Sequence, residues 1–543
     1  MKRLTLYLFS VLCTVSTINA VAQDTTRKQV IEITSSYKPV LRNAVKINFQ
    51  ASNLSADTSK VRLQYNIPAQ NLFYTYQPLP LKPLALQTDT IMELGTRNFI
   101  KVGFGNYSTP YARAGFSLGD GKTSLVNIYA DYISSKGNIA NQDYSQFNVK
   151  AAGSYFTANN EFYGKAAINQ SNYYLYGYDH SIDTFSKDEV KQRYSTLILN
   201  AGLRNKDVNA AGINYNPNIQ FSFVSNADKV TENTVVVKAP VDKTINDKFT
   251  VKVALNADAT TYDTKNLPAN VSIHNNVFQL APAVVYDAQK FTVQAGVTPT
   301  WDNSQLNVLP DINVEFPVKD KIFLVQAGWV GEIIKNTYQY LSGVNPYLQT
   351  PLSQTNTRET EFYGGIKATV GNHFNFNAKI GLVTYHNLPL FVNDSIIGNS
   401  FYIRNESKAD NLRIHVDFSY INKERFTFNG GLTINGFTGL TDNTKAWHQS
   451  PIEVESSVRW WADKKILLKA DLYAFGGAPY LLPGNINKSL SGGADLGAGV
   501  EYSITKQWSG WLDINNLLNN KYERWHNYPV YGLNFLIGAK YSF

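Results

Sequence analysis

The sequence predicts an all-β protein: a transmembrane antiparallel β-barrel of about 22 strands that follows a short extended N-terminal segment. Three observations lead to this prediction. Apolar and polar residues alternate with a period of two through most of the chain. Short turns alternate with longer loops between these stretches. After the first residues, no apolar run reaches the ~20 residues that a membrane-spanning helix needs.

The alternation is clearest at the end of the chain, from Leu533 to Phe543. The odd-numbered positions there are apolar or aromatic, and most of the even-numbered ones are small or polar. A period of two places the two sets on opposite faces of a strand. A soluble sheet could also bury one such face, but the same pattern returns in nearly every strand from residue 97 onward. We therefore expect a closed sheet with an apolar outside.

The first 22 residues have the layout of a secretory signal peptide. Lys2 and Arg3 precede an apolar run over 4–15, and Ala20 to Ala22 provide small residues for cleavage. We expect a mature chain that begins after Ala22. Because Cys13 is the only cysteine, the mature chain has none, which excludes disulfides and thiolate metal ligands.

Residues 23–96 differ in composition from the barrel region. Repeated prolines exclude a central strand or a helix in the second half of this segment, because proline lacks the backbone N–H; they are Pro68, Pro78, Pro80 and Pro83. Residues 29–34 could form a short strand or an extended recognition segment. Two alternatives stay open: a partial or vestigial plug in or below the barrel, or a disordered periplasmic tail.

Residues 97–543 are predicted to form the barrel. An even number of strands places both chain ends in the periplasm, and the least regular segments, 232–240 and 398–407, set an uncertainty of two strands. The predicted strands lie near 98–106, 111–119, 123–134, 144–156, 161–178, 191–204, 211–225, 232–240, 247–258, 275–287, 290–301, 305–316, 320–332, 358–371, 374–385, 410–421, 425–437, 450–461, 464–474, 489–503, 507–518 and 531–543.

Charged residues occupy one face of several predicted strands. An Arg or Lys that faces the bilayer midplane costs ~2–4 kcal/mol, so these residues are expected to face a water-filled lumen. They form either a structural ladder of paired charges or a contact surface for a plug or a solute. The lumen-facing candidates are Lys379, Arg413, His415, Asp417, Glu453, Arg459, Lys469, Asp471, Asp495, Glu501 and Lys540.

Composition and motifs argue against several functions. Removal of Lys2 and Arg3 lowers the formal charge from +8 to +6 (8 − 2), and no Lys/Arg cluster suggests a nucleic-acid partner. Six of the seven histidines fall in predicted loops or turns, and only His415 lies in a predicted strand. Because no nucleophile, phosphate loop or metal-ligand spacing stands out, we expect a protein that is not an enzyme and has no cofactor.

Aromatic residues gather in two of the predicted outer loops. They could dock a ligand, although Tyr and Trp are equally expected in the aromatic belt of a membrane interface. Loops 333–357 and 386–409 are the largest and are expected to form the outer vestibule. The aromatic loop residues are Tyr338, Tyr340, Tyr347, Trp525, His526, Tyr528 and Tyr531.

The C-terminal region carries a resemblance to a known family. The run Asn-Asn-Leu-Leu-Asn-Asn-Lys-Tyr at 515–522, a Tyr-Pro and a Tyr-Gly pair within 528–532, and the terminal Tyr-Ser-Phe resemble the closing strands of TonB-dependent receptors. The signal, loops and aromatic content resemble the Bacteroidetes members. The resemblance implies a 22-stranded outer-membrane barrel. It also implies that Tyr541 and Phe543 form the C-terminal signal read by the barrel-insertion machinery.

The N-terminal region departs from that family. The 74 residues of 23–96 (96 − 22) are fewer than the ~100–150 of a small domain, so a full plug domain is not expected. The sequence therefore suggests a TonB-dependent-receptor-like barrel that binds or transports an unknown solute across the outer membrane. The alternative is a non-transporting scaffold or secretion-associated barrel that binds envelope proteins. Candidate partners are outer-membrane lipid, the barrel-insertion machinery, TonB and surface lipoproteins.

Overall fold

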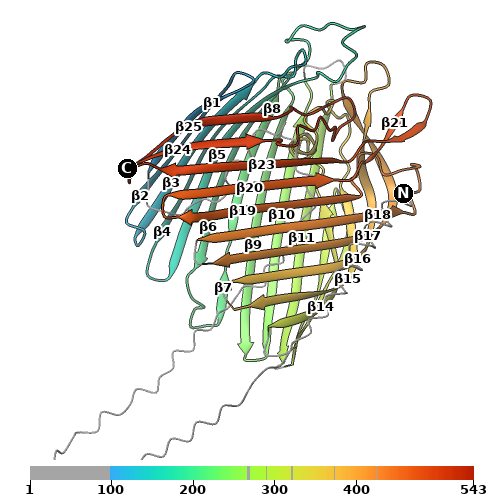
Figure 1. Cartoon of the computed structure of the whole chain (residues 1–543). Helices are drawn as coiled ribbons and strands as arrows, with labels where there is room; N and C mark the ends of the chain where they lie inside the picture. The colour runs from blue at the N-terminus through green and yellow to red at the C-terminus, as the bar shows by residue number, and fades with distance from the viewer. Residues whose placement is uncertain (1–97, 266–269, 289, 319–321, 372, 423–424) are drawn as a thin grey trace, which may run out of the picture. The chain divides into compact units, whose positions relative to one another are not determined.

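The described part of the chain forms one closed antiparallel β-barrel (Figure 1). The structure, a computed structural model, describes residues 98–543 except 266–269, 289, 319–321, 372 and 423–424. The predicted signal peptide 1–22 and the segment 23–96 lie outside the described residues. The first strand pairs with the last, from Phe99 opposite Ser542 to Gly105 opposite Leu536, and this pairing closes the sheet.

The barrel wall is built from strands of 7 to 22 residues, apart from the short strand β7. They are β1 (Phe99–Gly105), β2 (Thr109–Gly119), β3 (Ser124–Ser135), β4 (Tyr144–Phe156), β5 (Asn160–Tyr174), β6 (Lys191–Asn205), β7 (Ile213–Tyr215), β8 (Asn218–Asn226), β9 (Thr231–Asn246), β10 (Phe249–Asp263), β11 (Ser272–Ala288), β12 (Phe291–Asp302), β13 (Gln305–Val318), β14 (Phe323–Ile334), β15 (Thr357–Val370), β16 (Phe374–Asn393), β17 (Phe401–Asn422), β18 (Phe426–Thr438), β19 (Ile452–Asp463), β20 (Ile466–Phe475), β23 (Gly493–Ser503), β24 (Trp508–Asn515) and β25 (Asn534–Ser542).

The predicted strand number of about 22 is confirmed. The sheet contains 23 strands, but β7 and β8 are two pieces of one wall position, because both pair with β9. Tyr215 lies opposite Val241, and the pairing resumes with Asn218 opposite Lys238. Pro217 lies in the gap, and proline has no backbone N–H to donate to a ladder. The predicted strand 211–225 is therefore interrupted, and 232–240, which the sequence left uncertain, is the full strand β9.

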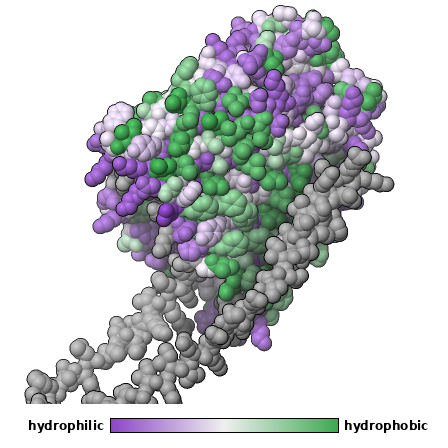
Figure 2. Space-filling model, in the orientation of Figure 1, coloured by the Kyte–Doolittle hydropathy of each residue, from purple (hydrophilic) through white to green (hydrophobic). Residues whose placement is uncertain are grey.

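The wall has two chemically different faces. On β16, Ile380 and Leu382 are 52% and 64% exposed, whereas the alternate positions hold Lys379 and Gly381. Large apolar side chains are exposed in the same way on most other strands, and Figure 2 shows hydrophobic residues gathered over the strands. A closed sheet with this apolar exterior places the barrel in the outer membrane, as the sequence predicts. Among the described residues, no helix is long and apolar enough to cross a membrane.

At one end of the barrel most strands are joined by turns of two to four residues, and the longest links lie at the other end, where β1–β2 and β12–β13 are nevertheless joined by short turns at 106–108 and 303–304. We call these the turn end, where β1 begins and β25 ends, and the loop end. Links at the loop end include 175–190, 335–356, 439–451 and 516–533. The helix α2 (Tyr338–Val344) lies in the second of these, and the hairpin β21 (Pro479–Leu482) and β22 (Ile486–Ser489) lies between β20 and β23.

The predicted outer loop 386–409 is wrong. Most of it is strand, because β16 continues to Asn393 and β17 begins at Phe401, and the two pair up to Asn393 opposite Phe401. In the sequence, polar residues such as Arg404 and Asn405 indicated a loop at this position. They are compatible with a strand because this part of the hairpin exceeds the ~9–11 residues that span a membrane. The prediction that His415 is the only histidine in a strand is also wrong, because His386 lies in β16 and His274 lies in β11.

The closing seam between β1 and β25 is packed around one indole ring. Trp511 on β24 is 3% exposed, and Gly103 of β1 lies opposite Gly538 of β25. A Cβ atom on Gly103 would lie 2.4 Å from the Trp511 ring, and one on Gly538 would lie 1.9 Å from the carbonyl oxygen of Val102. The two glycines therefore make room for the indole at the position where the sheet closes.

Replacement of Gly538 by valine is expected to destabilise the barrel by about 1–3 kcal/mol, because overpacking displaces backbone or side chains. The measurement is the urea midpoint of the refolded barrel in detergent. Gly364→Val is the matched control, since a Cβ there meets nothing within 4 Å. Equal midpoints for the two variants would contradict this account of the seam.

Candidate functional site

The links at the loop end fold against the wall and form a compact aromatic cluster. Its loop members pack with side chains of β2 to β6, β8, β10, β24 and β25, so the cluster joins distant parts of the wall. We give the name aromatic cap to six central residues of this cluster, which are Tyr176, Tyr338, Tyr347, Phe401, Trp525 and Tyr528. Each of the six is at most 6% exposed.

The aromatic cap is held together by ring contacts between three links and the first residue of β17. Tyr347 stacks on Tyr528 with ring centroids 3.6 Å apart and planes 17° from parallel. Tyr176 meets Tyr528 edge-on at 4.8 Å, and Phe401 meets Trp525 edge-on at 5.3 Å. The sequence singled out four of the residues in these two loops that belong to the cap. In this structure their rings are buried against other aromatic side chains and do not line an open vestibule: Tyr347 stacks on Tyr528, whereas Tyr338 contacts Tyr194 and Tyr262 of the wall.

Helix α2 is fixed to the wall by a buried carboxylate. Glu232 of β9 is 1% exposed, and its carboxylate accepts from the backbone N–H groups of Tyr338 at 2.6 Å and Gln339 at 2.9 Å. The hydroxyl of Thr337 caps the next free N–H, that of Tyr340, at 3.1 Å. Helix N-termini carry unpaired N–H groups, so an anion there satisfies them and also favours the helix dipole.

Further hydrogen bonds tie the link 335–356 to wall strands on several sides. Tyr194 of β6 donates to the carbonyl oxygen of Pro346 at 2.9 Å, and Tyr262 of β10 donates to that of Pro351 at 2.8 Å. Lys335 pairs with Asp258 of β10. The link 335–356 therefore lies across the loop end and is held in place by non-covalent polar contacts.

Tyr340 connects this link to a charged group on the wall. Burial raises the pKa of Tyr340 to about 12, and the nearby carboxylates of Glu332 and Glu359 add to the shift. Glu359 and Glu361 of β15 both pair with Arg413 of β17, at 2.6 Å and 3.0 Å. This wall therefore carries three carboxylates around one guanidinium beneath α2.

The remaining lumen-facing candidates also have partners. Lys379 lies over the ring of Tyr363, with its Nζ 4.3 Å from the centroid, and the backbone N–H of Asn516 donates to Asp495 at 3.2 Å. Glu455 lies two residues after Glu453 on β19 and faces the same side of the strand. The other pairs are His415–Asp417 at 2.7 Å, Arg459–Asp471 at 2.9 Å, Lys469–Asp513 at 2.8 Å, Lys540–Glu501 at 3.2 Å and Glu453–Arg524 at 3.3 Å.

The structure thus brings the candidates together as neighbouring pairs along β15 to β25 and not as one focused cluster. Sequence reasoning missed four partners: Glu359, Glu361, Asp513 and Arg524. The first three obey the same alternation as their partners and could have been found from it. Arg524 lies in a loop, and no local pattern identifies it. Among the described residues, no group of His, Cys, Asp and Glu could hold a metal ion.

The C-terminal aromatics lie at the turn end. The ring of Tyr541 is 4.9 Å from that of Trp508 and 5.7 Å from that of Phe543. Phe543 is 53% exposed. These contacts place both rings beside the closing seam.

A buried histidine joins two links at the loop end. His448 is 2% exposed, and its Nδ1 lies 2.7 Å from the carbonyl oxygen of Phe391. A carbonyl oxygen only accepts, so Nδ1 carries the proton and Nε2 faces the backbone N–H of His526 at 3.5 Å. Burial lowers the pKa of His448 to about 3, and the positive charge of Arg524 adds to the effect. His448 is therefore neutral at pH 7.

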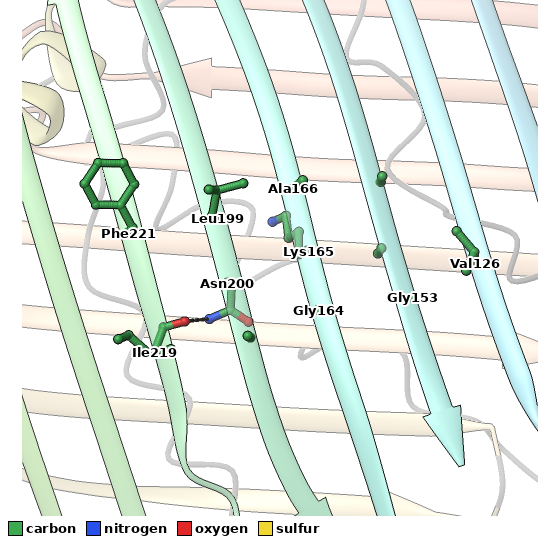
Figure 3. Close-up of a pocket in the computed structure, with 12 residues that line it drawn as sticks. Val126, Gly153, Gly164, Lys165, Ala166, Leu199, Asn200, Ile219 and Phe221 are labelled. Atoms are coloured by element: carbon green, nitrogen blue, oxygen red, sulfur yellow. Dashed lines mark hydrogen bonds between the residues drawn. The ribbon is translucent and has the colours of Figure 1, made fainter.

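The wall between β3 and β8 has a shallow hollow on its apolar face (Figure 3). Its floor consists of small residues of β4 to β6, such as Gly153 and Gly164, and Leu199 and Phe221 border it. Lys165 and Asn200 also line it, from the alternate positions of their strands. The hollow carries no convergent polar groups, so it does not have the chemistry of a solute site.

Comparison with known proteins gives structural neighbours only. No protein-family model matches the chain, and no curated protein matches its sequence. The siderophore receptor PirA from Acinetobacter baumannii matches with a TM-score of 0.63 and 9% identity, over 82% of this chain and 80% of that chain. The FrpB iron transporter from Neisseria meningitidis matches with a TM-score of 0.61 and 12% identity, over 82% and 81%.

A variant of the ferric enterobactin receptor from Pseudomonas aeruginosa matches with a TM-score of 0.59 and 11% identity, over 82% of this chain and 80% of that chain. The barrel is similar in fold to TonB-dependent receptors. The 22-stranded barrel that the C-terminal motif implied is thereby confirmed. At 9–12% identity the similarity is one of fold.

Glu232→Ala is expected to loosen α2. The change leaves two backbone N–H groups and the side-chain amide of Gln354 without their acceptor, which costs about 1–3 kcal/mol and increases local opening by roughly 5- to 150-fold. Amide hydrogen exchange over 338–344 measures this opening. Glu189→Ala is the control, because Glu189 is an exposed loop carboxylate that accepts only from Ser186. Unchanged exchange over 338–344 in Glu232→Ala would show that the carboxylate does not hold the helix.

Acidification is expected to loosen the loop end through His448. Its folded pKa of about 3 lies below the ordinary value of 6.5, so the unfolded form takes up the proton first as the pH falls. The stability from neutral His448 is complete above pH 6.5 and decreases below it, by about 1.4 kcal/mol per pH unit. Hydrogen exchange of 439–451 between pH 7 and pH 5, corrected for intrinsic rates, measures this. His448→Gln should remove that dependence; a variant with the same dependence rejects the assignment.

Proposed function

We propose that this chain is an outer-membrane receptor barrel of the TonB-dependent type, not an enzyme, that binds a solute at its loop end and lets it cross the membrane. The observation that carries the proposal is the link 335–356, which lies across the loop end of a closed barrel. Hydrogen bonds and ring stacking hold this link, with Glu232 and Tyr528 as the main partners. Such contacts can be broken and remade during a transport cycle.

The inner wall supports the same proposal. Most of the charges described above are paired, for example Arg413 with Glu359 and Lys469 with Asp513. Paired charges line a polar passage without the cost of leaving a charge unpaired. We propose that the lumen candidates form this lining, as a structural ladder along which a solute passes. The similar folds of PirA and FrpB, a siderophore receptor and an iron transporter, favour transport but do not identify the solute.

The N-terminal part of the proposal follows from the sequence. We propose that residues 23–96 supply a partial or vestigial plug and that TonB is a partner of the barrel. We also propose that Tyr541 and Phe543 serve as the insertion signal, read by the barrel-insertion machinery. Surface lipoproteins are candidate partners at the loop end.

A scaffold is the second candidate function, and exposed apolar residues favour it. Ile396 and Ile182 are 89% and 79% exposed on links at the loop end. Exposed apolar side chains in this setting suit contact with another protein. A scaffold would use these loops to bind envelope proteins and would keep its barrel closed.

Conductance in planar bilayers distinguishes the two functions. The full mature chain is expected to conduct little, because the link 335–356 covers the loop end. Replacement of 338–354 by a short Gly-Ser linker is expected to open a stable pore, alone or together with deletion of 23–96. Removal of 481–488 from the β21–β22 hairpin is the control and should leave conductance unchanged. A barrel that stays closed after both deletions and copurifies stoichiometrically with envelope proteins is a scaffold.

A further inference from the structure

The ladder between β11 and β12 is broken in the middle of the wall. Pairing runs from the turn end to Ala283 opposite Gly296 and resumes, in the same register, at Gln279 opposite Thr300. Three successive positions between these are unpaired. The ladders on either side continue through the same residues, because β10 pairs with β11 and β12 pairs with β13 without a gap. The break is therefore confined to one interface.

Two prolines lie at this break. When the register is continued across it, Pro282 of β11 lies opposite Val297 and Pro299 of β12 lies opposite Leu280. Proline has no backbone N–H, so it cannot donate to a ladder and is rarely found inside a central strand. The amino-acid sequence therefore builds the break into this interface.

The other side of the β12–β13 hairpin is also incompletely paired. Pairing of β13 with β14 stops at Asp311 opposite Val330, although β14 pairs with β15 as far as Ile334. The first unpaired residue of β13 is again a proline, Pro310. Among the described residues, the loop-end half of the hairpin therefore has no ladder to β14 and only three paired positions with β11. We call this half, residues 297–310, the flap.

Side-chain hydrogen bonds hold the tip of the flap. Asn356, the last residue of the link 335–356, donates to the carboxylate of Asp302 at 2.6 Å. Asn303 donates to Oδ1 of Asn275 at 3.1 Å. Arg358 of β15 donates to the side chain of Asn307 at 2.8 Å. The bond from Asn356 joins the flap directly to the link that covers the loop end, so movement of that link removes one of its holding contacts.

The two faces of the flap suit a contact with lipid. Trp301, Leu306 and Val308 are 42%, 57% and 63% exposed on the outer face. The alternate positions next to the break, which face the lumen, hold small uncharged residues: Ala281, Ala283, Gly296 and Thr298. An opening here would join lumen and bilayer without exposing a charge to lipid, in contrast to the charged wall of β15 to β25.

We propose that the flap is a lateral gate in the barrel wall, latched by Asn356. When the link 335–356 moves, the bond from Asn356 to Asp302 breaks and the flap swings outward about the positions of the three prolines. The gap admits the acyl chain of an amphiphile from the half of the bilayer nearest the loop end into the lumen. The gate goes beyond the proposed function, because this route passes through the side of the wall and needs no solute at the loop end.

Quenching by lipid tests the gate on the full mature chain in bilayer vesicles. A fluorescent label is attached to Thr298→Cys on the lumen side of the flap, and the vesicles contain lipids with a nitroxide on the acyl chain. The nitroxide quenches the label only on close approach. Asn356→Ala and Asp302→Ala each remove the latch, so each is expected to increase quenching about twofold or more, because the flap then opens more often.

Two controls isolate the gate. Ala254→Cys places the label on the lumen side of β10, which is paired continuously on both sides, and should show no added quenching in either latch variant. Asn405→Ala removes a hydrogen bond of 2.9 Å from β17 to Thr355 of the same link but leaves the flap untouched. This variant should leave the label on Thr298→Cys as it is in the original chain.

Amide hydrogen exchange gives a second readout. The flap is expected to exchange roughly tenfold or more faster than residues 255–263 of β10 at the same end of the wall, because it has fewer ladder bonds to break. Equal exchange in these two segments, or equal quenching in Asn356→Ala and Asn405→Ala, overturns the proposal. Unchanged protection of β9 and β10 verifies that each variant is folded. Neither readout uses conductance, so failure of the gate and failure of the proposed function are distinguishable.

Discussion

The hydrocarbon interior of a membrane offers no partner to a backbone N–H or C=O group, and this constraint sets the form of the whole sheet. An open sheet would leave one row of such groups unpaired on each edge strand. Here β1 and β25 pair with one another over seven residue positions and remove both edges. The seam depends on small residues, because Trp511 packs where Gly103 and Gly538 lie opposite each other. The first and last strands of the barrel thus pair where small residues leave room for the indole ring.

Closure of the sheet also separates two chemical environments. Every second side chain faces lipid, and the others share an interior in which charge must be paired. Lys469 and Asp513 illustrate this, since both side chains are less than 10% exposed and lie 2.8 Å apart. Buried charges of this kind are tolerated only when each has its counter-charge. The interior is therefore a set of short-range pairs, and the links at the loop end can lie across it without a conflict of charge.

The period-two pattern was sufficient to predict the barrel, its strand number and the faces of strands such as β16. It failed where lipid no longer imposes that pattern. In the distal half of the β16–β17 hairpin, β17 carries five consecutive polar residues over 404–408, so Arg404 and Asn405 gave no strand signal. The contacts at the loop end were also beyond reach, because Glu232 holds a helix 106 positions away in the sequence. The sequence around Glu232 or around Tyr338 contains no pattern that predicts this contact.

The long hairpin β16–β17 has a consequence for the links around it. β17 has 22 residues, and ~9–11 are enough to span the membrane, so roughly 11 residues or about 36 Å of strand extend past it. This part is not a free projection, because Leu390 and Phe391 of β16 are at most 3% exposed and His448 contacts the carbonyl oxygen of Phe391. The hairpin therefore serves as a buttress outside the lipid, against which the links of the loop end pack.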